Sequence, residues 1–204
     1  MSEAETTIEK IHETAKAEFL KKGFRGASLR NIVKQAGVTT GAFYGYYKSK
    51  EELFDALVEE HYNTFIGMYE KTQKDFTFLS PEEQIEKMGK MSGETLQKMM
   101  KYAFEHKDAF RLLLGSSEGT KYENMVHDMV ETEVEATHAF AGVTEKLGYP
   151  KYCVDSTLEH ILVSGLFSAF FEMVIHDVPY EKATECLREL RDFYTAGWQK
   201  IMGF

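Results

Sequence analysis

A run of basic residues near the N-terminus is the feature of this 204-residue sequence with the clearest chemical meaning. Between Phe19 and Lys50 there is no Asp or Glu, and seven basic side chains occur there: Lys21, Lys22, Arg25, Arg30, Lys34, Lys48 and Lys50. Residues 1–50 carry a net charge of +4 and residues 51–204 carry −13, in a chain whose total is −9. A basic end on an acidic chain favours binding to phosphate groups, and hence to nucleic acid. A solvated basic face is the competing explanation.

Residues that could hold a metal or perform catalysis are fewer. Glu131, Glu135 and His138 are spaced so that they share one face of a helix. Other acidic side chains surround them, and a solvated face explains the group better than a metal site. Glu172 and His176, four residues apart, are most simply a surface pair. The sequence has no HExxH motif, no glycine-rich phosphate loop and no Ser/His/Asp order. We therefore predict no enzyme, no metal and no cofactor.

The elements that must position these side chains are helices. Capping boxes recur, one of them at Ser156 and Glu159. Glycines follow apolar segments, and apolar residues repeat with a period of 3.6 rather than 2. These signals predict an all-α protein of about nine helices, at residues 6–22, 28–36, 39–45, 50–74, 81–105, 108–116, 120–147, 155–175 and 179–202.

The sequence also indicates where the protein resides. The longest apolar stretch, Ile161–Phe171, has 11 residues, too few to span a bilayer. Cys153 and Cys186 lie far apart and belong to no CxxC motif, which fits a reducing compartment. We expect a soluble, cytoplasmic protein with no membrane partner.

The segment Gly23–Phe54 predicts two short helices joined by a tight turn. Ser28 is placed to cap the first helix, and Gly37 can take the left-handed conformation that ends it. Thr39 is placed to cap the second helix, Thr40–Tyr46. A short helix with small, polar residues in its first turn is the shape that enters a major groove with its N-terminus first.

This segment closely resembles the DNA-binding signature of the TetR family of transcriptional regulators, over roughly residues 8–55. The matching positions are Ser28-Leu29, Ile32, Ala36-Gly37-Val38-Thr39, Gly41, Phe43-Tyr44, Tyr46-Tyr47, Lys50 and Leu53-Phe54. The resemblance implies a three-helix, helix-turn-helix DNA-binding head at residues 1–50 and a connecting helix at 51–79. A larger helical bundle at 80–204 would then sense a ligand and form the dimer.

By the same resemblance, two groups of residues contact double-stranded DNA. The base edges are faced by Thr39, Thr40, Gly41 and Ala42, and the phosphates by Ser28, Tyr44, Tyr46 and Lys50. Phe43 and Tyr47 are expected to pack the core of the head, and core packing explains Tyr46 almost equally well. Two positions depart from the family: Thr40 replaces a residue that is often basic, and Gly45 one that is often bulky. Both changes shorten the reach toward DNA, so we expect fewer base contacts.

The C-terminal bundle is rich in side chains that can line a pocket. Eight of the ten methionines lie between Met68 and Met173, among many aromatic residues. Such residues often fill a core, but the resemblance favours a mostly apolar cavity of about 300–1,000 Å³ for a small apolar effector. The lining residues we expect are Met91, Tyr102, Phe110, Met129, Phe167 and Phe171.

The last two helices are predicted to form the dimer. Gly165 and Ala169 would let a partner backbone approach, and an apolar stripe runs from Leu187 to Trp198. By resemblance, a homodimer would hold two recognition helices on a pseudo-palindromic operator, and the effector would release this repressor. Burial of both helices within one chain is an alternative to the dimer. A constitutive dimeric DNA-binding protein without a ligand, and a helical-bundle enzyme with a vestigial head, are alternatives for the function.

Overall fold

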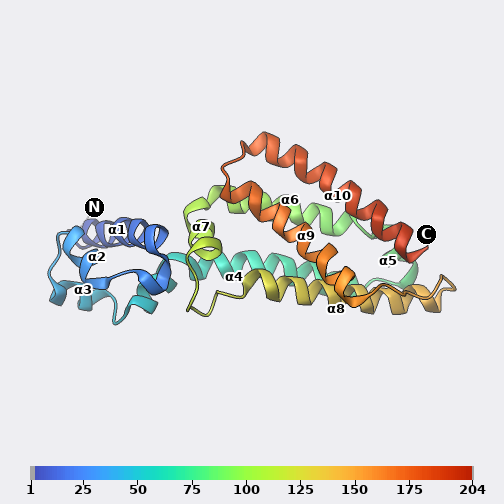
Figure 1. Ribbon diagram of the computed structural model, residues 1–204, viewed down its shortest axis with the longest axis horizontal. Coiled ribbons are helices and arrows are strands. Elements are labelled where there is room, and N and C mark those ends of the chain that lie inside the picture. Colours follow the sequence, from blue (N-terminus) through green and yellow to red (C-terminus); the bar gives the residue numbers. More distant parts are fainter. Residues whose placement is uncertain (1–2, 204) are drawn as a thin grey trace. The chain divides into compact units, whose positions relative to one another are not determined.

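The computed structural model describes residues 3–203, which form ten α-helices and no strand (Figure 1). The chain divides into two compact units. The head unit comprises the described residues up to Thr64 together with His106–Glu123, and the body unit comprises Phe65–Glu105 and the residues from Asn124 onward. The sequence predicted a linear division at residues 50 and 80. The structure instead groups α7 (Lys107–Gly115) with the head, because α7 packs against α1 (Glu3–Gly26).

The head unit is built on α1, whose apolar residues recur every four positions and so share one face. α2 (Leu29–Gln35) packs against α1, and α3 (Thr40–Tyr46) packs against α2. The rings of Phe19, Phe24 and Phe54 lie with their centroids 5.1–5.9 Å apart. The fully buried side chains of this core include Ile11, Ala15, Phe19, Ile32, Phe43, Leu53 and Phe54. The predicted three-helix head is confirmed.

Backbone conformation ends the first two helices of the head. Gly23 interrupts α1 with φ +68°, and the next amide, that of Phe24, donates to the carbonyl of Ser116 at 2.8 Å. Gly37 follows α2 with φ +69°, the left-handed conformation that the sequence predicted. Such values of φ are strained for residues with a side chain, so each glycine allows the turn that follows.

The body unit contains α5 (Pro81–Lys87), α6 (Lys90–Glu105), α8 (Met125–Lys146), α9 (Ser156–Ile175) and α10 (Tyr180–Met202). α9 packs against α6, α8 and α10 (Figure 1). Phe167, Phe170 and Phe171 on α9 are buried, and the latter two contact the ring of Phe65. By length and composition α9 could also cross a membrane, a longer apolar helix than the sequence analysis counted. Core helices of soluble proteins share that composition, and its packing within the body unit fits this role.

Three local predictions were wrong. The helix expected at 81–105 is two helices, because Met88 is extended at ψ 134° and Gly89 has φ +75°. The helix expected from residue 120 begins at Met125, after a series of turns. The cap expected from Ser156 is made by Asp155, whose carboxylate accepts from two amides of α9 at 2.9 and 3.2 Å. The protein therefore has ten helices in its described part rather than nine.

Glu18 links α1 to the start of α2 through a buried carboxylate. Its side chain is 3% exposed. One oxygen accepts from Lys22 Nζ at 2.7 Å and from the Ser28 amide at 3.2 Å, and the other accepts from Asn31 Nδ2 at 2.8 Å. These hydrogen bonds, the one from Lys22 above all, hold the pKa of Glu18 below its usual value.

We predict that Glu18→Gln destabilises the head by about 1–3 kcal/mol at neutral pH, because the amide cannot accept all three bonds. A lowered pKa in the folded state means that the ionised carboxylate stabilises the protein above its ordinary pKa and that this contribution is lost as pH falls. The difference in unfolding free energy between wild type and variant should therefore become smaller below about pH 4.5. Urea unfolding followed by circular dichroism at several pH values measures it.

Glu13→Gln is the matched control, since Glu13 is an exposed carboxylate on the same helix. It should change stability by less than about 0.5 kcal/mol. A Glu18→Gln variant as stable as this control at neutral pH would contradict the role assigned to Glu18.

Candidate functional site

Two hydroxyl groups fix the N-termini of α2 and α3, as the sequence predicted. Ser28 Oγ accepts from the Asn31 amide at 3.3 Å, and Thr39 Oγ1 accepts from the Ala42 amide at 3.1 Å. Each hydroxyl still has its proton to donate, and the remaining amides of the first turn of α3 have no helical acceptor. The start of α3 can therefore both donate to and accept from a polar partner.

The side chains of α3 divide sharply into one buried anchor and an exposed face. Phe43 is fully buried and packs α3 onto the head, as predicted. Thr40, Gly41 and Ala42 are exposed, and the ring of Tyr44 is 53% exposed. Tyr46 is half-buried, which agrees with the packing alternative for its ring. The residues expected to face the base edges, 39–42, thus all lie exposed at the start of α3.

The basic residues near this face differ in their surroundings. Arg30, Lys34 and Lys48 are exposed. Lys50 is half-buried, and its ammonium donates to the carbonyls of Phe24 at 2.7 Å and Ala27 at 3.2 Å. It also lies 4.4 Å from the centroid of the Phe24 ring. From the sequence, Lys50 is expected to contact a phosphate; in the structure its ammonium instead binds the carbonyls of Phe24 and Ala27 at the end of α1.

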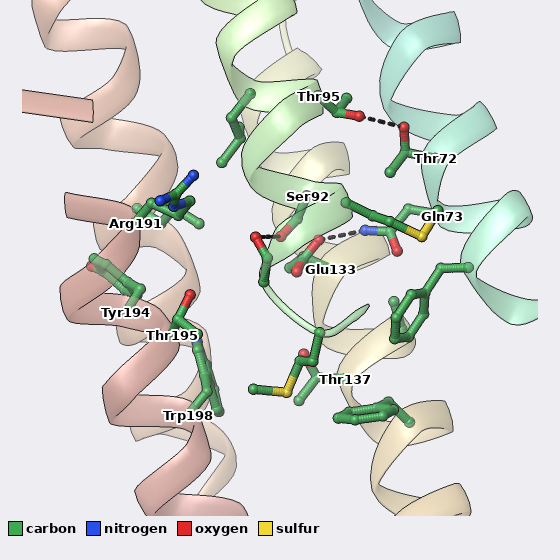
Figure 2. A pocket seen from close by; sticks show the side chains of 18 of the residues that line it. Thr72, Gln73, Ser92, Thr95, Glu133, Thr137, Arg191, Tyr194, Thr195 and Trp198 are labelled. Carbon is green, nitrogen blue, oxygen red and sulfur yellow. Dashed lines mark hydrogen bonds between the residues drawn. The ribbon is translucent and has the colours of Figure 1, made fainter. Parts of the chain in front are cut away.

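A cavity of about 160 Å³ lies in the body unit, among side chains of α4 (Lys50–Thr77), α6, α8, α9 and α10 (Figure 2). This volume is below the expected range of about 300–1,000 Å³ and resembles that of cavities that admit benzene. Four methionines line it: Met88, Met91, Met99 and Met202. Because methionine side chains are flexible, the cavity can adjust to the shape of a ligand.

Two of the six residues expected to line a pocket do so: Met91 and Phe167. Tyr102, Met129 and Phe171 belong to the body unit but not to the cavity wall, and Phe110 is fully buried in the head unit. Composition identified apolar residues without distinguishing core from cavity, because both are made of the same side chains.

The sequence analysis missed the polar residues of the cavity. Glu133 Oε2 accepts from Tyr69 Oη at 2.7 Å and from Gln73 Nε2 at 2.5 Å. Thr72 and Thr95 are joined by a hydrogen bond of 2.7 Å; Figure 2 shows this bond and the one from Gln73 to Glu133. Burial raises the pKa of Glu133. One signal was available: Glu133 stands four residues after Met129 and seven before Phe140, in the apolar stripe of α8.

The acidic and histidine residues of α8 are engaged separately. His138 Nε2 lies 2.7 Å from Glu159, which is 1% exposed, and Glu131 lies 3.4 Å from His160 Nδ1. Within residues 3–203 no group of three or more His, Cys, Asp or Glu side chains is placed to hold a metal ion. Glu172 and His176 form the expected surface pair at 2.7 Å.

α9 and α10 expose large apolar side chains. Ile161 is 59% exposed, Leu158 49% and Phe193 72%. Gly165, which was expected to admit a partner chain, faces α10 of the same chain: a Cβ atom there would lie 2.6 Å from Tyr194 Oη. The small residue therefore serves packing within the body unit, and the exposed apolar residues are left as the candidate assembly surface.

Comparison with known proteins agrees with this geometry. Residues 11–57 match the domain family described as bacterial regulatory proteins, tetR family. The HTH-type transcriptional regulator YerO of Bacillus subtilis (strain 168) is 36% identical over 110 residues, which are 52% of this chain and 34% of YerO. The repressor NemR of Escherichia coli (strain K12) is 37% identical over 59 residues, which are 29% of this chain and 30% of NemR. The chain thus matches about a third of the length of these relatives.

Solved structures extend the likeness of fold to more than nine tenths of the chain. A TetR-like transcriptional regulator from Rhodococcus sp. RHA1 has a TM-score of 0.56 at 19% identity, over 94% of this chain and 96% of that one. A transcriptional regulator from Aquifex aeolicus VF5 has a TM-score of 0.52 at 24% identity, over 92% and 99%.

We predict that Lys50→Ala lowers the stability of the head by about 1.5–3 kcal/mol, because the carbonyls at the end of α1 lose a charged donor. Urea unfolding followed by circular dichroism measures this. Lys48→Ala is the control, since it removes an exposed lysine two residues away and should change stability by less than about 0.5 kcal/mol. Equal stability of the two variants would refute the structural role of Lys50.

Proposed function

This chain belongs to the TetR family of bacterial regulatory proteins, and we propose that it is a transcriptional regulator whose head unit binds double-stranded DNA. One observation carries the proposal: α3 is anchored by a single buried side chain, Phe43, while residues 40–42 of its first turn are exposed and uncharged. Uncharged, small groups at a helix N-terminus can approach base edges, and the basic residues around them supply attraction to phosphates.

In the proposed complex, two sets of groups contact the DNA. Thr39, Thr40, Gly41 and Ala42 face the base edges in the major groove. Ser28, Tyr44 and Tyr46 hydrogen-bond to phosphates on either side, and Arg30, Lys34 and Lys48 add charge. Lys50 does not contact the DNA in this proposal. It binds the carbonyls at the end of α1, directly before α2 begins.

The proposed assembly is a homodimer on a pseudo-palindromic operator. Two recognition helices contact successive major grooves only when a two-fold axis holds them one helical turn apart. The exposed apolar residues of α9 and α10 supply the surface, because large apolar side chains on two neighbouring helices are costly to leave in water.

The proposed regulation is repression relieved by a small molecule in the cytoplasm. The effector binds in the cavity of the body unit. α4 transmits the effect of this binding to the head, because residues 50–64 of the helix belong to the head and 65–77 to the body. A coupling of about 1–3 kcal/mol would change operator affinity about 5–150-fold. Repression is a simpler form of regulation than activation, because a protein bound to DNA can by itself block the polymerase.

A second candidate function is a DNA-binding regulator that takes no ligand. The cavity volume of about 160 Å³, below the usual range for ligand sites, favours it. Selection of random duplexes by the purified protein tests both candidates. We expect a two-fold symmetric motif, with binding reduced by members of a metabolite library. Enrichment of no sequence would refute the DNA-binding proposal, and a motif insensitive to every metabolite would support the second candidate.

We predict that Thr40→Ala and Tyr44→Phe affect DNA binding differently. Thr40 lies on the first turn of α3, so its loss should change which base pairs are preferred. Loss of the Tyr44 hydroxyl should weaken binding to all sequences alike, by about 3–10-fold. Gel-shift titration against the selected duplex and its single-base-pair variants separates the effects. If both variants keep affinity and base preference, the proposed docking is wrong.

We predict that Phe193→Glu dissociates the dimer, because it places a charge in the apolar surface of α10. Light scattering coupled to gel filtration measures the mass at micromolar concentration. Phe78→Glu is the matched control: Phe78 is 77% exposed but lies outside α9 and α10. A wild-type monomer, or equal dissociation of both variants, would count against this interface.

A further inference from the structure

The cavity of the body unit contains a carboxylate that is only half satisfied. Tyr69 and Gln73, both on α4, donate to the same oxygen of Glu133, at 2.7 and 2.5 Å. Figure 2 shows the bond from Gln73. Among the described residues, no group hydrogen-bonds to the other oxygen, Oε1. A carboxylate oxygen can accept two hydrogen bonds, so Oε1 is available to a ligand.

The cations that line the cavity already have partners. Arg191 donates to Asp192 at 2.8 and 3.1 Å, and Lys87 lies 3.0 Å from Glu83. The stem of Arg191 is also held against α6, where a Cβ atom on Gly93 would lie 2.3 Å from Arg191 Cδ. Glu133 is thus the one charged group of the cavity wall for which the described part of the chain provides no counter-ion.

Glu133 is half-buried in the cavity wall, where partial loss of water raises its pKa and makes the unpaired charge costly. A cationic ligand would remove the cost by pairing with the carboxylate, whereas an anion would increase it. The electrostatics of the cavity therefore discriminate by charge.

The remaining wall suits the body of such a ligand. Six aromatic side chains line the cavity: Tyr69, Phe76, Phe140, Phe167, Tyr194 and Trp198. The faces of aromatic rings attract cations as well as apolar groups. A volume of about 160 Å³ accommodates a single ring with a short substituent.

We propose that the cavity binds a small organic ammonium cation, whose apolar body lies among the aromatic rings and whose N–H group donates to Glu133 Oε1. The inference rests on the proposed effector site and replaces the uncharged apolar ligand expected from the sequence. It also names the link to α4: the carboxylate that would hold the cation through Oε1 holds Tyr69 and Gln73 of that helix through Oε2.

Three probes of nearly equal size test the charge: benzylamine, which is protonated at neutral pH, neutral benzyl alcohol and anionic benzoate. Trp198 lines the cavity and is the only tryptophan in the sequence, so its fluorescence reports occupancy directly. We expect benzylammonium to bind at least about tenfold more tightly than benzyl alcohol, and benzoate to bind weakest.

Glu133→Gln should remove this preference. It should weaken the binding of benzylammonium at least about tenfold and change the affinity for benzyl alcohol less than about twofold. Glu135→Gln removes an exposed carboxylate from the same helix and should leave all three affinities unchanged. Circular dichroism of each variant verifies that the body remains folded.

The outcomes separate this inference from the function on which it rests. If benzyl alcohol or benzoate binds as tightly as benzylammonium, or if Glu133→Gln keeps the preference, the ligand class is wrong while the cavity stands as a ligand site. If none of the probes binds, both the ligand class and the effector site are refuted. DNA binding by the head is measured separately and is not affected by either result.

Discussion

The head unit depends on the side chain that binds the carbonyls at the end of α1. The last carbonyls of a helix have no amide partners within it, and in this protein the ammonium of Lys50 reaches them from the first turn of α4. The interaction joins the end of the first helix to the start of the fourth, with the ring of Phe24 beneath the charge. Because α2 begins two residues after Ala27, the same contact fixes where the α2–α3 pair starts.

Glu18, on α1, forms a second polar link to the start of α2. Its carboxylate binds the amide of Ser28 and the side chain of Asn31, so the first turn of α2 is tied to α1 by charge as well as by apolar packing. Two oppositely charged side chains thus position a motif whose exposed face has little charge of its own. The stability of the motif and its recognition surface are supplied by different residues.

Local features of the head could be predicted from the sequence because they are set by neighbours in the chain. Caps at Ser28 and Thr39, the left-handed Gly37 and the buried Phe43 all follow from patterns within a few residues. The partner of Lys50 lies more than twenty residues away, and no local pattern indicates it. The same limit explains Phe110, which is apolar and buried as expected but belongs to the other unit, and Gly165, whose small size serves Tyr194 of its own chain.

Three glycines, Gly89, Gly93 and Gly165, determine where α10 lies. A methyl group at any of them would come within 2.3–2.7 Å of Thr195, Arg191 or Tyr194, side chains that all line the cavity. Replacement of any one by alanine would displace α10 or one of these side chains. Changes at Gly93 and Gly165, which do not line the cavity, could therefore reshape it without altering any residue of its wall. A comparison of relatives that considered only the residues lining the cavity would overlook these two positions.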